Sequence, residues 1–181
     1  EMILTVTANA AIDKRYVVEG FGVGNVNRVK SCDANEGGKG INVSRVASIT
    51  GEKVTATGFL GGHAGKFISE HVEEKGIKSE FVWCRGESRT CINIWDEKEK
   101  KQTEFLEPGF SVTEEDCAAL LKKFNELLGA CKVVTISGST PKGASSLLYR
   151  EMIQATREAG KPVILDTSGS LLEDCLLARP T

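Results

Sequence analysis

The residue types best suited to chemistry lie in one glycine-rich stretch, residues 37–43, which reads Gly-Gly-Lys-Gly-Ile-Asn-Val. Glycine lets the backbone adopt positive φ and come close to a ligand. Apolar residues recur with helical spacing after it, and the free N–H groups at the start of a helix favour an anion. A lysine adds a mobile positive charge. The stretch predicts an anion site, although such a turn can also serve only as a connection.

Two other phosphate-binding loops have a different spacing. A Walker loop has Gly, four residues and then Gly-Lys-Ser or Gly-Lys-Thr, whereas the dinucleotide fingerprint has Gly-x-Gly-x-x-Gly at the end of a strand. Neither pattern occurs in the chain. A generic dinucleotide-binding protein is therefore disfavoured.

Five segments, in order along the chain, resemble a known family. Residues 35–45 resemble the N-terminal signature of the ribokinase-like (PfkB-type) sugar kinases, with Ser44 in place of a final alanine. Residues 7–13, Thr-Ala-Asn-Ala-Ala-Ile-Asp, are similar to the opening of the 1-phosphofructokinase and tagatose-6-phosphate kinase branch. Three later segments match that branch at similar spacing: 58–62, 104–109 and 137–143.

Strand and helix patterns alternate along most of the chain. Apolar runs predict strands at residues 2–7, 53–60, 132–137 and 162–165, with a helical pattern after each later one. Residues 113–116, Thr-Glu-Glu-Asp, have the layout of a capping box. Repeated βα units predict an α/β fold whose parallel sheet is covered on both faces and binds ligands at the carboxyl ends of its strands. The resemblance makes this a ribokinase-like three-layer α/β/α domain with a small β-sheet lid.

The lid is expected in two segments, about 14–32 and 80–107. Its strands are predicted within 15–30 and at Phe81–Trp83, Arg89–Trp95 and Gln102–Leu106. In the family such lids cover the substrate and pair between subunits. The resemblance therefore implies a homodimer through the lid.

The resemblance also implies a site for a sugar phosphate, which needs acceptors for its hydroxyls and cationic donors for its phosphate. Asp13 and Asn42 suit the first need, and Lys39 and Arg89 suit the second. The other substrate-binding positions carried over from the family are Gly37, Gly38, Ser137, Gly138 and, reaching a neighbouring subunit's ligand, Arg28. Without the resemblance, a solvated aspartate and surface arginines would be the simpler interpretations.

Two residues depart from the family pattern. Ala10 replaces a proline, which loosens a turn that positions Asp13. Glu36 places a carboxylate beside the anion site, and this weakens phosphate binding unless the side chain points away. Both departures bear on the substrate more than on the fold.

No catalytic residue is assigned in these 181 residues. Phosphoryl transfer needs a base, an electropositive hole for the moving group and magnesium on the nucleotide. In the family the first two come from a late Gly-Ala-Gly-Asp motif, which this sequence lacks. We therefore expect the base beyond Thr181, the C-terminal nucleotide-binding and catalytic part to be absent, and the isolated chain to be inactive. ATP and Mg²⁺ are the cofactors expected of the full-length family member.

The function that the resemblance implies is ATP-dependent phosphorylation of a ketohexose phosphate. Fructose 1-phosphate, giving fructose 1,6-bisphosphate, comes ahead of tagatose 6-phosphate. A kinase for an unphosphorylated sugar or a nucleoside is a neighbouring alternative, which Lys39 and Arg89 argue against. The alternative from another class is a non-catalytic sugar-phosphate-binding module that ends naturally at Thr181.

Composition is that of one soluble globular domain, with 40% hydrophobic and 27% charged residues. A net charge of −2 gives no reason to expect a nucleic-acid or membrane partner, and a cytoplasmic location is the default. Six cysteines without a Cys-x-x-Cys pair predict reduced thiols. The two histidines lack the spacing of zinc ligands, so no metal site is expected.

Overall fold

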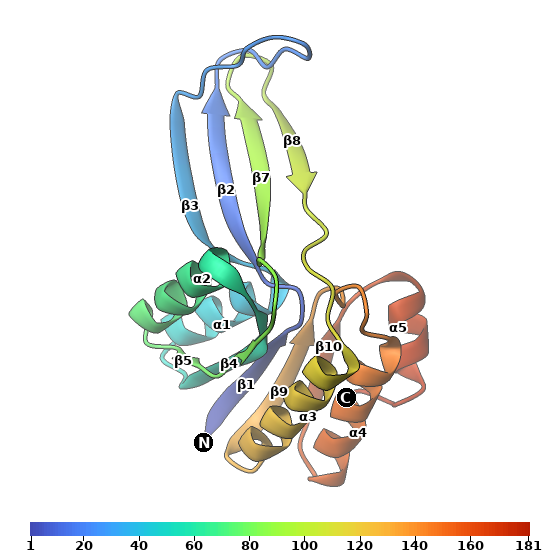
Figure 1. Ribbon diagram of the computed structural model, residues 1–181. Coiled ribbons are helices and arrows are strands. Elements are labelled where there is room, and N and C mark those ends of the chain that lie inside the picture. The colour runs from blue at the N-terminus through green and yellow to red at the C-terminus, as the bar shows by residue number, and fades with distance from the viewer.

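The main sheet is entirely parallel and has the order β10-β9-β1-β4-β5, with β6 also paired to β4 (Figure 1). The four predicted strands form most of it, and the short β5 was not predicted. The computed structural model describes all residues from 1 to 181. The strands of this sheet are β1 (Met2–Thr7), β4 (Val54–Leu60), β5 (Lys78–Ser79), β6 (Val82–Trp83), β9 (Cys131–Ser137) and β10 (Val163–Asp166). The predicted α/β class with a mainly parallel sheet is confirmed.

Helices cover both faces of this sheet (Figure 1). One face carries α1 (Lys39–Ile49) and α2 (Gly62–Glu74), and the other carries α3 (Glu114–Leu128), α4 (Ser146–Glu158) and α5 (Gly169–Leu176). Each face has its own hydrophobic core. No helix in the chain combines the length and the apolar character needed to cross a membrane.

The two cores are built from alternate residues of the central strands. Leu4 and Val6 of β1 are fully buried on the side of α3 and α4, while Ile3 packs on the side of α1 and α2. On α3, Leu120 and Phe124 lie one turn apart and are fully buried. The chain therefore follows period 2 in its strands and period 3.6 in its helices.

The predicted capping box at the start of α3 is confirmed. The hydroxyl of Thr113 accepts a hydrogen bond from the amide of Asp116 at 3.1 Å, and the Asp116 carboxylate accepts one from the Thr113 amide at 2.9 Å. These bonds satisfy backbone donors that the helix itself leaves free.

A second sheet, which we call the lid, stands on the carboxyl-terminal edge of the main sheet (Figure 1). It has the order β3-β2-β7-β8, with β2 (Ala11–Val18), β3 (Ser31–Gly37), β7 (Arg89–Asp96) and β8 (Lys101–Leu106). The β2–β7 pair is parallel and the other two pairs are antiparallel. The lid is thus a mixed sheet, assembled from two segments far apart in the sequence.

Two parts of the expected lid differ in the structure. Val82–Trp83 pairs with β4 of the main sheet, and the preceding Phe81 is buried in the core beneath α1 and α2, so that burial decides the placement. Residues 19–30 form no strand but a loop at the far end of the lid, where Val23 and Val26 are exposed. The fourth lid strand is Ser31–Gly37, which has few apolar residues.

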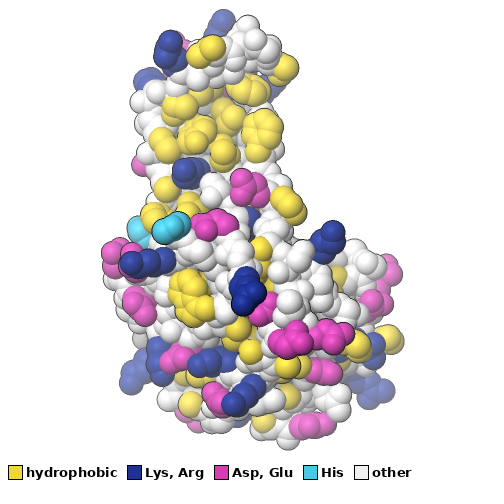
Figure 2. All heavy atoms as spheres, in the orientation of Figure 1, with side chains coloured by type: hydrophobic (Ala, Val, Ile, Leu, Met, Phe, Trp, Pro, Cys, Tyr) yellow, Lys and Arg dark blue, Asp and Glu magenta, His cyan; other side chains and the backbone are white.

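The two faces of the lid differ in polarity. Strand pairing places Tyr16 opposite Ile94 and Ile92 opposite Phe105, all on one face. These four residues are only partly covered, and hydrophobic side chains gather on the lid in Figure 2. The other face carries polar residues, including Asp13 at the base of the lid. One face of the lid is therefore polar and the other is an uncovered apolar surface.

Candidate functional site

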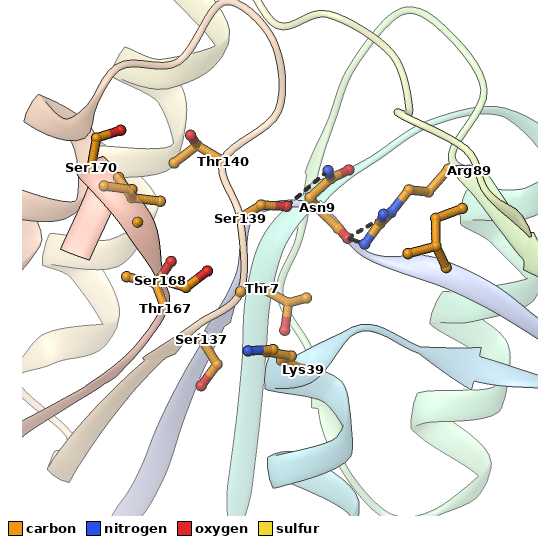
Figure 3. A pocket seen from close by; sticks show the side chains of 14 residues that line it. Thr7, Asn9, Lys39, Arg89, Ser137, Ser139, Thr140, Thr167, Ser168 and Ser170 are labelled. Atoms are coloured by element: carbon orange, nitrogen blue, oxygen red, sulfur yellow. Dashed lines mark hydrogen bonds between the residues drawn. The ribbon is translucent and has the colours of Figure 1, made fainter. Parts of the chain in front are cut away.

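A pocket of about 500 Å³ opens where the lid meets the carboxyl ends of β1, β9 and β10 (Figure 3). Its lining combines two cationic side chains with many hydroxyl groups and only two leucines. The lining residues are Thr7, Asn9, Lys39, Arg89, Leu106, Ser137, Gly138, Ser139, Thr140, Thr167, Ser168, Gly169, Ser170 and Leu171. Such a surface suits a polar, anionic ligand.

Arg89 enters the pocket from the first residue of β7. Its Nε and Nη2 donate to the Asn9 carbonyl oxygen at 3.1 and 2.9 Å, and its Nη1 donates to the Glu107 carbonyl oxygen at 3.3 Å. No carboxylate forms an ion pair with this guanidinium. Backbone carbonyls thus hold the group in place while its charge stays available for an anion.

Lys39 is the first residue of α1, and its ammonium points into the pocket on the side of Ser137 (Figure 3). Its ammonium lies 3.6 Å from the carboxylate of Asp166, and both side chains are more than half exposed. An exposed pair of this kind contributes little stability, so an incoming anion can compete for the lysine. Lys39 and Arg89 therefore give this pocket two cationic groups, one from α1 and one from β7.

The glycines just before and at the start of α1 have steric reasons to be glycine. Gly38 has φ +105°, and as the residue before the helix it offers no side-chain cap to the open N–H groups. A Cβ on Gly40 would lie 2.1 Å from the Thr7 hydroxyl, and one on Gly37 would lie 2.1 Å from the Asp13 carboxylate. The backbone at these glycines therefore passes close to side chains of both sheets.

Hydroxyl groups in the pocket are largely without partners inside the chain. The hydroxyl of Ser139 accepts a hydrogen bond from the Asn9 amide at 3.3 Å. The Thr7 hydroxyl is buried, lies near Lys39 in Figure 3 and has no hydrogen-bond partner. Unpaired hydroxyls in a polar pocket remain free to bind a ligand or water.

The structure brings four of the predicted site residues together in this pocket: Lys39, Arg89, Ser137 and Gly138. Asp13 lines an adjacent hollow of about 310 Å³ on the polar face of the lid. Asn42 lines a groove along α1 that it shares with Lys39 and Asp166. Gly37 and Gly38 line none of these hollows and lie against Asp13 and Thr7 respectively.

Arg28 is not in this cluster. It is exposed in the loop at the far end of the lid, away from the pocket of its own chain. Its predicted contact would therefore need a ligand bound by another subunit.

Electrostatics differ between the two acidic residues near the site. Burial raises the pKa of the Asp13 carboxyl above its usual value, and the guanidinium groups of Arg89 and Arg45 oppose that rise. Glu36 points away from the anion site, with its carboxylate buried against Lys75 and Arg45. Because Glu36 points away, its carboxylate does not meet the condition under which it would weaken phosphate binding.

The segment 167–171 at the start of α5 is the largest part of the lining to which the sequence assigned no substrate contact, although its loop was expected at the ligand-binding edge of the sheet. It follows β10 at the same sheet edge as the other loops, which was the available signal. A second omission is Glu87, whose carboxylate accepts hydrogen bonds from the amides of His63 and Ala64 at the start of α2. That helix terminus is therefore filled by the chain itself, and the Gly61-Gly62 turn is structural.

A magnesium site does not fit the residues of this chain. The pocket lining contains no carboxylate, and no group of three His, Cys, Asp or Glu side chains in the chain could hold a metal ion. Magnesium prefers an octahedral set of oxygen ligands that includes carboxylates. The pocket can hold the anionic group of a ligand but not, from these residues alone, a divalent cation.

A family model described as pfkB family carbohydrate kinase matches residues 4–180. The chain belongs to this family. The resemblance of the sequence to the PfkB-type sugar kinases is thereby confirmed. The three-layer α/β/α fold and the lid sheet are those expected of a pfkB carbohydrate kinase.

Solved structures agree with the pfkB assignment. A possible 1-phosphofructokinase from Thermotoga maritima is 36% identical with a TM-score of 0.92, over 98% of this chain and 57% of that one. A candidate phosphofructokinase from Staphylococcus aureus is 31% identical with a TM-score of 0.83, over 99% and 57%. The tetrameric inhibited form of phosphofructokinase-2 from Escherichia coli is 24% identical with a TM-score of 0.89, over 97% and 58%, and supports the fold alone. This pfkB chain thus spans little more than half the length of these proteins.

Proposed function

We propose that this chain supplies the sugar-phosphate site of a kinase that phosphorylates a ketohexose phosphate with ATP. The most suitable reaction is the conversion of fructose 1-phosphate to fructose 1,6-bisphosphate. The similarity to a possible 1-phosphofructokinase at 36% identity supports this choice over tagatose 6-phosphate. We also infer a cytoplasmic location, because sugar phosphates and ATP are cytoplasmic metabolites.

The observation that carries the proposal is the state of Arg89. A guanidinium that is held by three bonds to backbone carbonyls and has no carboxylate partner is prepared for an anion before the ligand arrives. Together with Lys39 in the same pocket, Arg89 suits the phosphate of the substrate better than a neutral sugar. An unphosphorylated sugar would leave these two charges without a partner.

The remaining site residues suit the sugar. Asp13, on the polar face of the lid, can accept hydrogen bonds from hydroxyl groups when it is ionised. The hydroxyl of Ser137 and the backbone of Gly138 offer further hydrogen bonds beside the phosphate. These groups would orient the substrate within reach of a phosphoryl donor, for which ATP is the family's choice.

No group in the pocket is placed to act as the base. Its lining contains no carboxylate or histidine, and the Gly-Ala-Gly-Asp motif does not occur in these residues. We therefore propose that residues 1–181 bind the sugar phosphate and do not transfer a phosphoryl group by themselves. This same observation supports the alternative function, a sugar-phosphate-binding module. Steady ATP-dependent formation of fructose 1,6-bisphosphate by the purified chain would overturn both.

Isothermal titration with fructose 1-phosphate tests the site directly. Replacing Arg89 by alanine removes a charge-assisted contact worth about 1.5–3 kcal/mol, so we expect affinity to fall roughly 10- to 100-fold. Arg85→Ala is the matched control, because Arg85 is an exposed arginine close by in sequence that lies outside the pocket. Tagatose 6-phosphate in the same titration ranks the two substrates. Equal affinity for Arg89→Ala and wild type would favour an unphosphorylated substrate.

We further propose that two copies associate through the apolar face of the lid. The uncovered residues Tyr16, Ile92, Ile94 and Phe105 support this, since adjacent apolar side chains on a free sheet face favour burial against a partner. In such a dimer, Arg28 at the far end of one lid could approach the ligand of the other copy.

A further inference from the structure

The side chain of Asn42 has a defined orientation. Arg45, three residues later on α1, donates from Nη2 to the Asn42 Oδ1 at 3.0 Å. A guanidinium group can only donate, so this contact settles which end of the amide faces Arg45. The NH₂ group of Asn42 then points the other way and has no partner in the chain. Asn42 lies beside Lys39 in the α1 groove.

Arg45 is itself held at the end of β3. Its Nη2 also donates to the Glu36 carbonyl oxygen at 2.8 Å, and its Nε lies 3.3 Å from Oε1 of the Glu36 carboxylate. Lys75, at the end of α2, pairs with that same carboxylate oxygen. The guanidinium is therefore fixed at three points, and Asn42 is one of them.

Glu36 is an unusual residue to bury. Its side chain is 1% exposed, and its second carboxylate oxygen, Oε2, has no hydrogen-bond partner. A buried ion pair with an unsatisfied oxygen contributes little net stability compared with well-packed apolar side chains. Anchoring α1 to β3 and α2 would explain part of the cluster, but it does not account for the bond from Arg45 to the exposed Asn42 amide, which lies beside Lys39 in the α1 groove.

We infer that Arg45, anchored by Glu36, is a positioning residue that turns the NH₂ group of Asn42 toward the ligand, so that Asn42 binds the sugar phosphate as a hydrogen-bond donor. The inference rests on the proposed function for its ligand, but the orientation of the amide does not depend on it. It gives Asn42 a donor role in place of the acceptor role that the residue type suggested. Asn42 and Lys39 then both donate to oxygen atoms of the ligand, and Asp13 is left as the acceptor.

Nuclear magnetic resonance of the ¹⁵N-labelled chain tests the orientation without any ligand. The side-chain amide pair of Asn42 is assigned by its loss in Asn42→Asp. Arg45→Met removes the donor while keeping an apolar stem, and we expect the Asn42 pair to move toward the shifts of a freely rotating amide. Lys75→Met is the matched control: it disturbs the same Glu36 carboxylate but touches neither Arg45 nor Asn42, so the Asn42 pair should stay in place.

Titration with fructose 1-phosphate then tests the role in binding. We expect the wild-type Asn42 amide signals to shift on binding, and Arg45→Met to raise the dissociation constant about fivefold, the effect of one hydrogen bond. Lys75→Met should lower the urea midpoint yet leave the dissociation constant unchanged. An equal loss of affinity in both variants would reduce Arg45 to a structural residue and overturn the inference.

The failure of the inference and that of the proposed function can be told apart. If the wild type binds no ketohexose phosphate, the function and the donor role both fail, whereas the amide signals still decide whether Arg45 orients Asn42. If the wild type binds but Arg45→Met changes neither the Asn42 signals nor the affinity, the function stands and the positioning role is wrong.

Discussion

At the scale of single residues, the site depends on side chains that are held by backbone groups. Arg89 is fixed by the carbonyls of Asn9 and Glu107. Conversely, Tyr149 of α4 holds backbone carbonyls that belong to the pocket. The fully buried Tyr149 donates its hydroxyl toward the carbonyl oxygens of Gly138 and Ser139, at 3.1 and 3.3 Å. Burial raises the pKa of this phenol, so the group stays protonated and remains a donor.

Replacing Tyr149 by phenylalanine should loosen the loop that follows β9. The change removes one hydroxyl and leaves the aromatic packing, so we expect a loss of about 1 kcal/mol in the free energy of unfolding, measured by urea denaturation. Affinity for fructose 1-phosphate should fall severalfold, because Gly138 and Ser139 line the pocket. Tyr16→Phe on the lid is the control, since the Tyr16 hydroxyl has no partner in the chain. Identical behaviour of the two variants would contradict a role for Tyr149 in the loop.

At the scale of elements, the far end of the lid is organised by one carboxylate. Asp96, the last residue of β7, accepts hydrogen bonds from the amides of Phe21, Gly20, Lys98 and Glu99 at 2.7 to 3.2 Å. These backbone donors, that of Phe21 first, lower the pKa of Asp96 to about 2. A single side chain thus ties the 19–30 loop to the β7–β8 hairpin.

This carboxylate predicts a pH dependence of the lid. An unfolded aspartate has a pKa of about 3.9, so the stabilisation is complete above about pH 4 and is lost as the pH falls toward 2. The protection of the Gly20 and Phe21 amides, measured as their hydrogen-exchange rates relative to an unfolded chain at the same pH, should fall in that window, and Asp96→Asn should show weaker protection without the transition. Asp33→Asn on β3 is the control, because it removes a charge without touching these amides. A flat profile for the wild type would show that the carboxylate does not organise the loop.

The lid also predicts the form of association. Phe105→Asp places a charge on the apolar face, and we expect it to convert a dimer into a monomer in light scattering coupled to size exclusion. Lys101→Asp, also on β8 and facing the same way, controls for the added charge at the exposed hairpin end. A dimer that survives Phe105→Asp would contradict association through this face.

Elements were predictable where the local pattern and the final environment agree. The strands β1, β4, β9 and β10 are short apolar runs with turn signals, and the α3 cap follows from Thr113 and its third neighbour. Strand β3, Ser-Cys-Asp-Ala-Asn-Glu-Gly, has little β-forming pattern of its own and becomes a strand because it pairs with β2. Only long-range contact could reveal it.

The site was predictable to the same degree. Lys39 and Arg89 could be named because family motifs surround them, and the structure brings both to one pocket. The direction of the Asn42 amide could not be read from the residue type, since it depends on the hydrogen bond from Arg45. The burial of Glu36 could not be read either, since it depends on Lys75 from another element. The roles of such residues become visible only in three dimensions.

At the scale of the whole molecule, one side of the sheet is unevenly covered. Beside β10, the groove along α1 is lined by Val43, Val46 and Ala47, and Val46 is 62% exposed. Ile49, one turn further along α1, is 78% exposed. Ile164 on β10 is 56% exposed, and β10 is an edge strand. Apolar residues beside an open strand edge favour association.

We therefore expect the chain to associate weakly through this groove, in addition to the lid. In the Phe105→Asp background, Val46→Lys should reduce the concentration-dependent rise in sedimentation coefficient. Leu147→Lys on α4 is the control, because it replaces an equally exposed apolar residue on the opposite face. Association that persists in Val46→Lys but disappears in Leu147→Lys would show that the self-associating surface lies on the α4 side and not along the α1 groove.

The junction between the two sheets has a mechanical consequence. Strand β1 ends at Thr7 and β2 begins at Ala11, so residues 8–10 are one of the four connections between the lid and the main layer and serve as a fulcrum for the lid. An arm of eight residues is about 26 Å long, and a rotation of about 10° at its base displaces the far end by about 4.5 Å. Arg89 grips the carbonyl of Asn9, at that fulcrum. Any anion that pulls on this guanidinium therefore applies torque to the whole lid.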